Sequence, residues 1–143
     1  MKSAVRTLLA VVAGMALAFA LVVAVEFFSA VVHPFPANFD GSIPEHVKRY
    51  PDWVLAVVVP MWGATAAAAT WVASRIGGRL AGALVTLLLA SALAFNLSML
   101  PYAMWFKIAM PAAFFVACLL GITYGRRVPS AAAGVNAASG SNR

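Results

Sequence analysis

Two long uncharged runs and the short charged turn between them decide the fold, and all three lie in residues 53–100, WVLAVVVPMWGATAAAATWVASRIGGRLAGALVTLLLASALAFNLSML. The turn is Arg75-Ile76-Gly77-Gly78-Arg79, and the runs beside it occupy residues 53–74 and 80–100. Each run is close to the roughly 20 residues that an α-helix needs to cross a hydrocarbon layer about 30 Å thick. So short a turn predicts two antiparallel neighbouring helices, and its glycines supply the backbone freedom for the reversal.

Two further runs have the same character: residues 7–32, with Glu26 as the only charge, and residues 108–125, with none. The chain of 143 residues is 64% hydrophobic and 10% charged, whereas a soluble domain is about 25% charged. Lipid offers no partner for backbone polar groups, so apolar runs of this length must be helices. The sequence therefore predicts an all-α fold, a membrane-embedded antiparallel four-helix bundle. Its helices are expected at about residues 5–32, 53–75, 79–100 and 106–125.

These helices form one predicted transmembrane domain, residues 1–127, which includes one long loop at residues 33–52 on the outer side. Residues 128–143 consist mainly of Ala, Ser, Gly and Asn. Such a segment cannot bury enough apolar surface to order itself, so it is predicted to be a flexible cytoplasmic tail.

The outer loop contains Ser42-Ile43-Pro44-Glu45, which has the form of a helix capping box. This pattern predicts a short amphipathic helix from Ile43 to Tyr50 that lies on the membrane surface or caps the bundle. Ile43, Val47 and Tyr50 are expected on its apolar face, and His46 is expected mostly on the polar face.

The first run also has features of a secretory signal, with Lys2 and Arg6 before it and Ala18-Phe19-Ala20 as a cleavage-like site. The apolar part of a signal is about 7–15 residues long, and residues 7–25 exceed that length. We therefore expect the first helix to be retained.

The distribution of Lys and Arg predicts the orientation of the chain. With the N-terminus inside, seven of these residues are cytoplasmic and three are external, in agreement with the positive-inside rule. The internal residues are Lys2, Arg6, Arg75, Arg79, Arg126, Arg127 and Arg143, and the external residues are Lys48, Arg49 and Lys107. The predicted location is a bacterial cytoplasmic (inner) membrane, with both termini cytoplasmic. Tyr50, Trp53, Tyr102 and Trp105 mark the outer boundary, where amphipathic rings are favoured.

Glu26 is the most informative polar residue because it is the only acid inside a predicted span. We expect it to belong to an outer-half polar cluster that consists of Glu26, Ser29, His33, Asn96 and Ser98. Pro60 and Pro111 fall in the same half and are expected to kink their helices. One interpretation is a hydrated or hydrogen-bonded glutamate near the interface, and the alternative is a proton- or cation-binding site. The first is favoured, because no second charge completes a pathway.

Small residues recur at a spacing of four along each predicted helix, which is typical of close helix packing in membranes. The expected packing glycines are Gly14, Gly63, Gly78, Gly82, Gly121 and Gly125. The alternative is that one of these rows mediates oligomer formation.

The sequence predicts no catalytic residue, metal or cofactor: Cys118 lies mid-helix, and His33 and His46 lack metal-ligand spacing. The +6 net charge sits at segment ends and not in a patch, so nucleic acid is not an expected partner. Expected partners are membrane lipids, and further copies or a larger membrane complex. The first hypothesis is a non-enzymatic bundle or accessory subunit. The second is a small proton- or cation-coupled carrier or channel that uses Glu26, and the weakest is an enzyme acting on a lipid at the outer face.

Three motifs carry a family resemblance. They are Glu26 followed by His33-Pro34-Phe35-Pro36, the segment WVASRIGG at residues 71–78, and the segment NLSMLPYAMWF at residues 96–106. From Val25 through Gly121 the chain resembles a group of uncharacterised small bacterial four-span integral membrane proteins. The resemblance implies a four-helix membrane fold and no particular activity.

Overall fold

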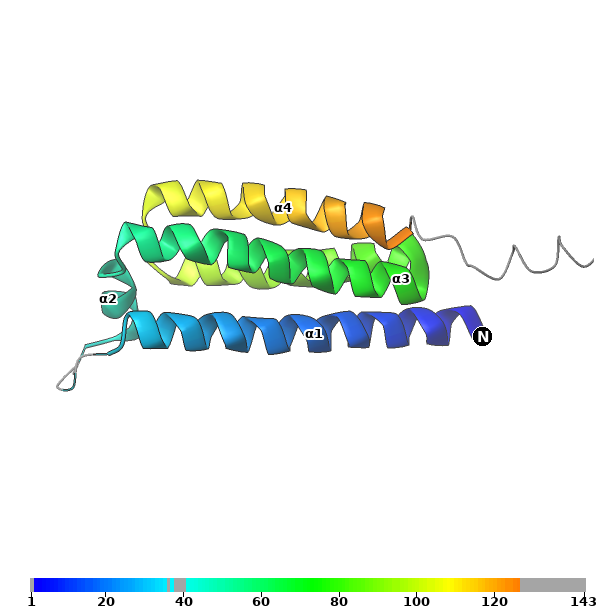
Figure 1. The fold of residues 1–143 in the computed structure, drawn as a ribbon, viewed down its shortest axis with the longest axis horizontal. Helices are drawn as coiled ribbons and strands as arrows, with labels where there is room; N and C mark the ends of the chain where they lie inside the picture. The colour runs from blue at the N-terminus through cyan, green and yellow to red at the C-terminus, as the bar shows by residue number, and fades with distance from the viewer. Residues whose placement is uncertain (1, 36, 38–40, 127–143) are drawn as a thin grey trace, which may run out of the picture.

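The computed structural model describes residues 2–35, 37 and 41–126, and in these residues the chain is all-α (Figure 1). Its helices are α1 (Lys2–Val32), α2 (Ile43–Lys48), α3 (Asp52–Met99) and α4 (Met104–Arg126). Three of them, α1, α3 and α4, are long and apolar enough to cross a membrane. The predicted tail at residues 128–143 and four residues of the outer loop (36 and 38–40) lie outside the described residues.

The prediction of four separate long helices is corrected to three, because the second and third predicted helices are parts of one 48-residue element, α3. Helical structure extends to both sides of the glycine turn with only Gly78 in a non-helical conformation, at φ 78° and ψ −171°. The turn is so short that no loop separates the two parts. We refer to residues 52–77 as the first arm of α3 and to residues 79–99 as the second arm.

The two arms of α3 lie antiparallel. A straight helix of 48 residues would be roughly 70 Å long at about 1.5 Å per residue. However, Asp52, the first residue of α3, accepts a hydrogen bond from Trp105, which follows closely after the last residue, Met99. Both ends of α3 therefore lie at the same end of the molecule, and Figure 1 shows the second arm running back behind the first. The positive φ at Gly78, which glycine adopts without steric cost, makes this reversal.

Helix α3 lies at the centre of the bundle and packs against both α1 and α4 (Figure 1). Gly14 of α1 fits against both arms: a Cβ atom placed on it would lie 2.9 Å from the Ala69 carbonyl oxygen and 3.1 Å from Val85. Gly121 of α4 lies closer still to Thr70 in the first arm. Small residues thus allow the backbones to approach closely, as expected where hydrophobic burial between helices provides little drive.

The molecule places its smallest apolar side chains inside and many of its largest outside. The outward-facing set includes Phe19, which is 73% exposed, and also Phe27, Leu87, Phe95 and Leu119. The buried set includes many alanines, namely Ala10, Ala18, Ala66, Ala69, Ala73 and Ala81, together with a few large side chains such as Met110 and Phe114. Water would penalise this arrangement, whereas a hydrocarbon solvent does not.

Helix α2 differs from its prediction in length and in its buried face. It ends at Lys48, before Pro51, because a residue that precedes proline is disfavoured in helical conformation. The capping box forms in part as expected, since the Ser42 N–H donates to the Glu45 carboxylate at 3.1 Å. However, Ile43 is 63% exposed and His46 only 4%, so the expected apolar and polar faces are wrong for these two residues. His46 is drawn inward by contacts with other aromatic rings.

Candidate functional site

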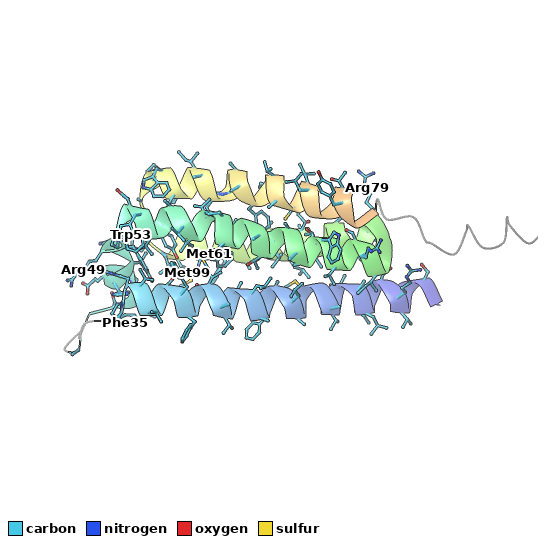
Figure 2. All side chains as sticks on the ribbon, viewed as in Figure 1. Phe35, Arg49, Trp53, Met61, Arg79 and Met99 are labelled. Carbon is cyan, nitrogen blue, oxygen red and sulfur yellow. The ribbon has the colours of Figure 1, made fainter. Side chains whose placement is uncertain are left out.

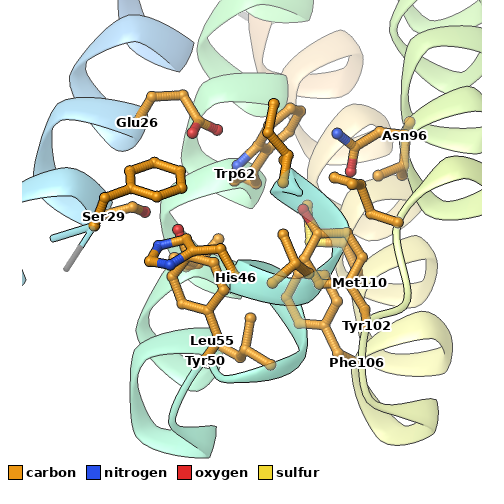
Figure 3. Close-up of a pocket in the computed structure, with 16 residues that line it drawn as sticks. Glu26, Ser29, His46, Tyr50, Leu55, Trp62, Asn96, Tyr102, Phe106 and Met110 are labelled. Carbon is orange, nitrogen blue, oxygen red and sulfur yellow. The ribbon is translucent and has the colours of Figure 1, made fainter. Parts of the chain in front are cut away.

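A cavity of about 360 Å³ lies at the end of the bundle that carries α2 (Figure 3). It is bounded by the end of α1, by α2, and by the ends of α3 and α4 that meet there. The lining residues are Glu26, Ser29, Phe35, Ile43, His46, Val47, Tyr50, Leu55, Val58, Trp62, Leu93, Asn96, Leu100, Tyr102, Phe106 and Met110. The cavity is therefore mainly apolar and aromatic, with a few polar groups, which is the usual character of a ligand site.

Glu26 supplies the only carboxylate among the described residues of the lining. Its side chain points into the cavity from α1, while Asn96 faces the same space from the second arm of α3 on the opposite side (Figure 3). Ser29, nearly one turn after Glu26 on α1, is buried and also lines the cavity. The described lining contains no Lys or Arg, and His46 is its one imidazole.

One wall of the cavity is an aromatic cluster that joins α2 to the end of α1. The His46 ring stacks on Phe35, with ring centroids 3.9 Å apart, and on His33 at 4.6 Å. Tyr50 completes the cluster, with its ring centroid 4.9 Å from that of His33 and 5.5 Å from that of His46. These contacts hold α2 over the cavity and explain why His46 is buried.

The opposite wall comes from the start of α4 and from the connection before it. Tyr102 and Phe106 pack with ring centroids 4.8 Å apart, and Trp62 of the first arm lies beside them in the lining (Figure 3). The Trp105 indole N–H donates to the Asp52 carboxylate at 3.0 Å, which fixes the first turn of α4 against the start of α3.

The environment shifts the pKa of three side chains around the cavity, those of Tyr102, Tyr50 and His33. Burial, with smaller contributions from the Glu26 charge and from Tyr50, raises the pKa of Tyr102 to about 12, although a hydrogen bond with the Asn96 side chain acts to lower it. Burial likewise raises the pKa of Tyr50, with a further contribution from Glu26 and an opposing one from a hydrogen bond with Ser29. Both phenols therefore remain neutral at physiological pH. Burial, followed by the proximity of His46, lowers the pKa of His33.

The structure brings together three of the five residues expected in the outer polar cluster. Glu26, Ser29 and Asn96 line the cavity, whereas His33 and Ser98 do not. His33 lies behind His46, and its buried Nε2 has no hydrogen-bond partner among the described residues. Ser98 is exposed, and its hydroxyl donates to the Phe95 carbonyl oxygen at 2.7 Å. Residues at the same level of the bundle do not necessarily line the same cavity, because the neighbouring helices determine how far the cavity extends.

The structure shows the backbone at the two prolines that were expected to kink their helices and the space around the six glycines that were expected to pack. Helical structure continues through Pro60 and Pro111, and Gly78 alone among the residues inside α3 has non-helical backbone angles. Among the expected packing glycines, four make close approaches: Gly14, Gly82, Gly121 and Gly125. At Gly63 an added Cβ would find only Ala117, at 3.8 Å, and at Gly78 it would find nothing within 4 Å. Gly78 therefore serves the chain reversal and makes no packing contact of this kind.

Sequence reasoning does not assign the aromatic part of the lining to a site. It treats Tyr102 as a boundary marker and Tyr50 as a boundary marker on the apolar face of the short outer helix, and it gives Trp62, Phe106 and His46 no role as ligand contacts. The usable signal is Trp62, a large indole near the middle of the apolar run of residues 53–74, where a boundary role does not apply.

Other candidate chemistry within the described residues is limited. No group of three or more His, Cys, Asp or Glu side chains in this part of the chain lies close enough to hold a metal ion. Cys118 is a free cysteine buried inside α4, away from the cavity lining. The geometry around the cavity is suited to binding an organic molecule.

Comparisons of the chain with protein-family models, with curated proteins and with solved structures find no match in any of the three. The resemblance to small bacterial four-span proteins therefore identifies no family. The fold and the cavity are the features from which a function can be inferred.

Proposed function

We propose that the chain is a multi-pass membrane protein that crosses the bilayer four times, through α1, the two arms of α3, and α4. The backward turn at Gly78 supports this proposal, because each arm has about the length of one crossing. Both termini would then face the cytoplasm, as the positive-inside rule favours, and the proposed location is the cytoplasmic (inner) membrane of a bacterium.

The distribution of arginines in the fold supports the same orientation. Arg6 donates a hydrogen bond to the Ile76 carbonyl oxygen, so the start of α1 and the turn with Arg75 and Arg79 lie at one end. Arg49, directly after α2, lies at the other end, and Figure 2 labels Arg49 and Arg79 at opposite ends of the bundle. The cavity would consequently open toward the external side.

Cysteine labelling tests this topology. In a Cys118→Ser background, Ser42→Cys and Ala103→Cys should react with a membrane-impermeant maleimide in intact cells. Ile76→Cys, at the exposed turn, should react only after the membrane is permeabilised. Reaction of all three from the same side would contradict four crossings.

We propose further that the protein works by binding a small ligand in the outer cavity, without catalysis. The observation that carries this proposal is one cavity of about 360 Å³ in which Glu26, Asn96 and several aromatic rings converge. Pockets that bind small molecules are mainly apolar and have volumes of about 300–1,000 Å³, so this cavity lies at the lower end of that range. Trp62, which lines the cavity, provides an internal reporter of occupancy.

A cavity-filling variant with a matched control tests the binding proposal. Val58 lines the cavity, whereas its neighbour Val57 is 39% exposed and is not part of the lining. Val58→Phe should abolish the retention of co-purifying small molecules, measured by native mass spectrometry, while Val57→Phe retains them. Equal retention by both variants would argue against the cavity as the binding site.

A carrier that moves its ligand or a proton is the second candidate, and the position of Glu26 at the cavity favours it. The inner half offers less support, because the Thr65 and Thr70 hydroxyls donate to carbonyl oxygens of their own helix at 3.0 and 2.7 Å. Flux into proteoliposomes that Glu26→Gln abolishes would support the carrier, and ligand binding without flux would support a binding protein.

A role as an accessory subunit, through further copies or a larger complex, is also supported by one feature. Ala67, Ala68, Trp71, Leu120, Gly121 and Tyr124 line an apolar groove of about 340 Å³ between α3 and α4. A Trp71→Ala variant should weaken such an assembly in detergent cross-linking, and unchanged cross-linking would exclude this groove as its contact.

A further inference from the structure

We propose that the ligand of the outer cavity carries an organic ammonium group, which binds between the Glu26 carboxylate and the aromatic rings of the lining. This inference rests on the proposed binding function and specifies the chemical class of the ligand. The same chemistry is presented by a free alkylammonium ion and by the headgroup of a choline lipid, and binding in membranes of different lipid composition distinguishes these two sources.

The charge of the cavity is the first argument. Among the described lining residues Glu26 is the only carboxylate and there is no Lys or Arg, while His46, the one imidazole of the lining, stacks on His33 and Phe35. Glu26 is an exposed residue that faces this mainly apolar lining. A ligand that supplies a positive charge complements its carboxylate better than a neutral or anionic ligand does.

The aromatic rings are the second argument. Rings attract a cation over their faces within about 6 Å of the centroid, and tryptophan does so best. Trp62, Tyr50, Tyr102 and Phe106 surround the space into which Glu26 points (Figure 3). Both tyrosines remain neutral phenols, so their rings keep this property at physiological pH.

The size and apolar character of the cavity are the third argument, and they favour an organic cation over a small inorganic one. A bare metal ion requires several oxygen or nitrogen ligands, and no group of three or more His, Cys, Asp or Glu side chains able to supply them exists among the described residues. Leu55, Val58 and Met110 provide apolar surface that suits methyl or ethyl groups on nitrogen. An alkylammonium group satisfies both kinds of surface, because it carries its charge inside an apolar shell.

The quenching of Trp62 fluorescence by choline and by its neutral isostere, 3,3-dimethylbutan-1-ol, tests the proposal. The protein is used as the full chain in nanodiscs, with Trp53 and Trp71 changed to Phe to reduce background emission. Choline should bind at least about tenfold more tightly than the isostere, and Glu26→Gln should remove this preference. Asp52→Asn is the matched control: it removes an acid at the same end but leaves an oxygen acceptor for Trp105, and it should preserve the preference.

A second variant covers the case in which Glu26→Gln fails to fold. Phe106→Leu removes one aromatic face from the lining and leaves Trp62 as the reporter, so it should weaken the binding of choline but not that of the isostere. If choline and the isostere bind equally well, and Val58→Phe abolishes the binding of both, the ammonium inference is overturned and the cavity-binding proposal stays intact. Absence of binding for both probes, together with equal retention of co-purifying molecules by Val57→Phe and Val58→Phe, would overturn both.

The composition of the nanodisc identifies the source of the ammonium group. If choline binds less well in phosphatidylcholine than in phosphatidylglycerol discs, and Glu26→Gln removes this difference, the lipid headgroup is the occupant. Equal binding in both lipids supports a free alkylammonium ion.

Discussion

Trp105 in the first turn of α4 donates its indole N–H to the carboxylate of Asp52, the first residue of α3, at 3.0 Å. This contact joins residues that are 53 positions apart in the chain. It shows that α3 begins where α4 begins, and it lies beside the wall of the cavity that Tyr102 and Phe106 form.

Removing this hydrogen bond should destabilise the start of α4. Trp105→Phe is expected to lower the free energy of unfolding by about 0.5–1.5 kcal/mol, the usual net contribution of one hydrogen bond. The measurement is unfolding in mixed micelles followed by circular dichroism. Asp52→Ala should have a similar effect, and the double variant should lose no more than either single one. Trp53→Phe, an exposed tryptophan at the same end, is the control, and an equal loss in that variant would contradict the role of the bond.

Close packing between α3 and α4 should make Gly121 intolerant of a side chain. A Cβ atom on Gly121 would collide with the Ala67 carbonyl oxygen and the Thr70 hydroxyl, whereas one on Gly63 would find only Ala117 at 3.8 Å. Gly121→Ala is therefore expected to cost about 1–3 kcal/mol of stability. Gly63→Ala should be neutral or should stabilise by up to about 1 kcal/mol, because alanine is the better helix former. Equal effects in the same unfolding assay would show that helix propensity, and not packing, determines both.

The reversal of α3 should depend on the glycine at position 78. Its φ of 78° and ψ of −171° belong to a region that is essentially restricted to glycine. Gly78→Ala is expected to cost about 1–3 kcal/mol, although no neighbouring atom lies within 4 Å of the added Cβ. The midpoint of thermal unfolding provides the measurement, and an unchanged midpoint would mean that the turn can adopt another backbone conformation.

Acid should weaken the packing of α2 over the cavity. Burial and the nearby His46 lower the pKa of His33, so the unfolded state binds the proton more readily than the folded state. The contribution of His33 to stability is therefore complete above its ordinary pKa near 6.5 and is lost as the pH falls below that value. Thermal unfolding midpoints between about pH 5 and pH 7 should decrease with acid. His33→Phe keeps a ring for stacking and should reduce this decrease, and an unchanged dependence would exclude His33 as its source.

Alkali should destabilise the cavity wall through Tyr102. Its pKa is raised from 10 to about 12, so the folded state holds the phenolic proton more tightly. Stability is therefore present below pH 10 and is lost between pH 10 and about 12. The tyrosinate absorbance should show one late-titrating phenol that Tyr102→Phe removes. Retention of the late phase in that variant would assign it to another tyrosine.

Much of the fold could be predicted from the sequence, but the count of separate long helices, the length of α2 and its buried face could not. The apolar runs, the short outer helix and the reversal at the Gly77-Gly78 pair all follow from local pattern. The count of separate helices was wrong because only Gly78 departs from helical geometry, and sequence does not reveal how few residues a turn requires.

The candidate site was predictable only in part. Glu26, Ser29 and Asn96 stand out as polar residues in apolar runs, and they do line one cavity. His46 was expected on the exposed face of α2, yet it is 4% exposed. Its position depends on stacking with Phe35 and His33, which no helical periodicity records.

The sequence by itself determined which segments are apolar enough to cross a membrane, and where their charges lie. The free energy of transfer into hydrocarbon is a property of each segment alone, so it can be summed over the residues of that segment. The tertiary structure decided which residues share the cavity, because that depends on how each helix is rotated about its axis. Helix α1 is apolar on all sides, so hydrophobicity marks no inner face, and only the row of small residues that includes Gly14 indicates one. The close approach of Gly14 to Ala69 and Val85 sets its rotation and thereby turns Glu26 toward the rings of α3 and α4.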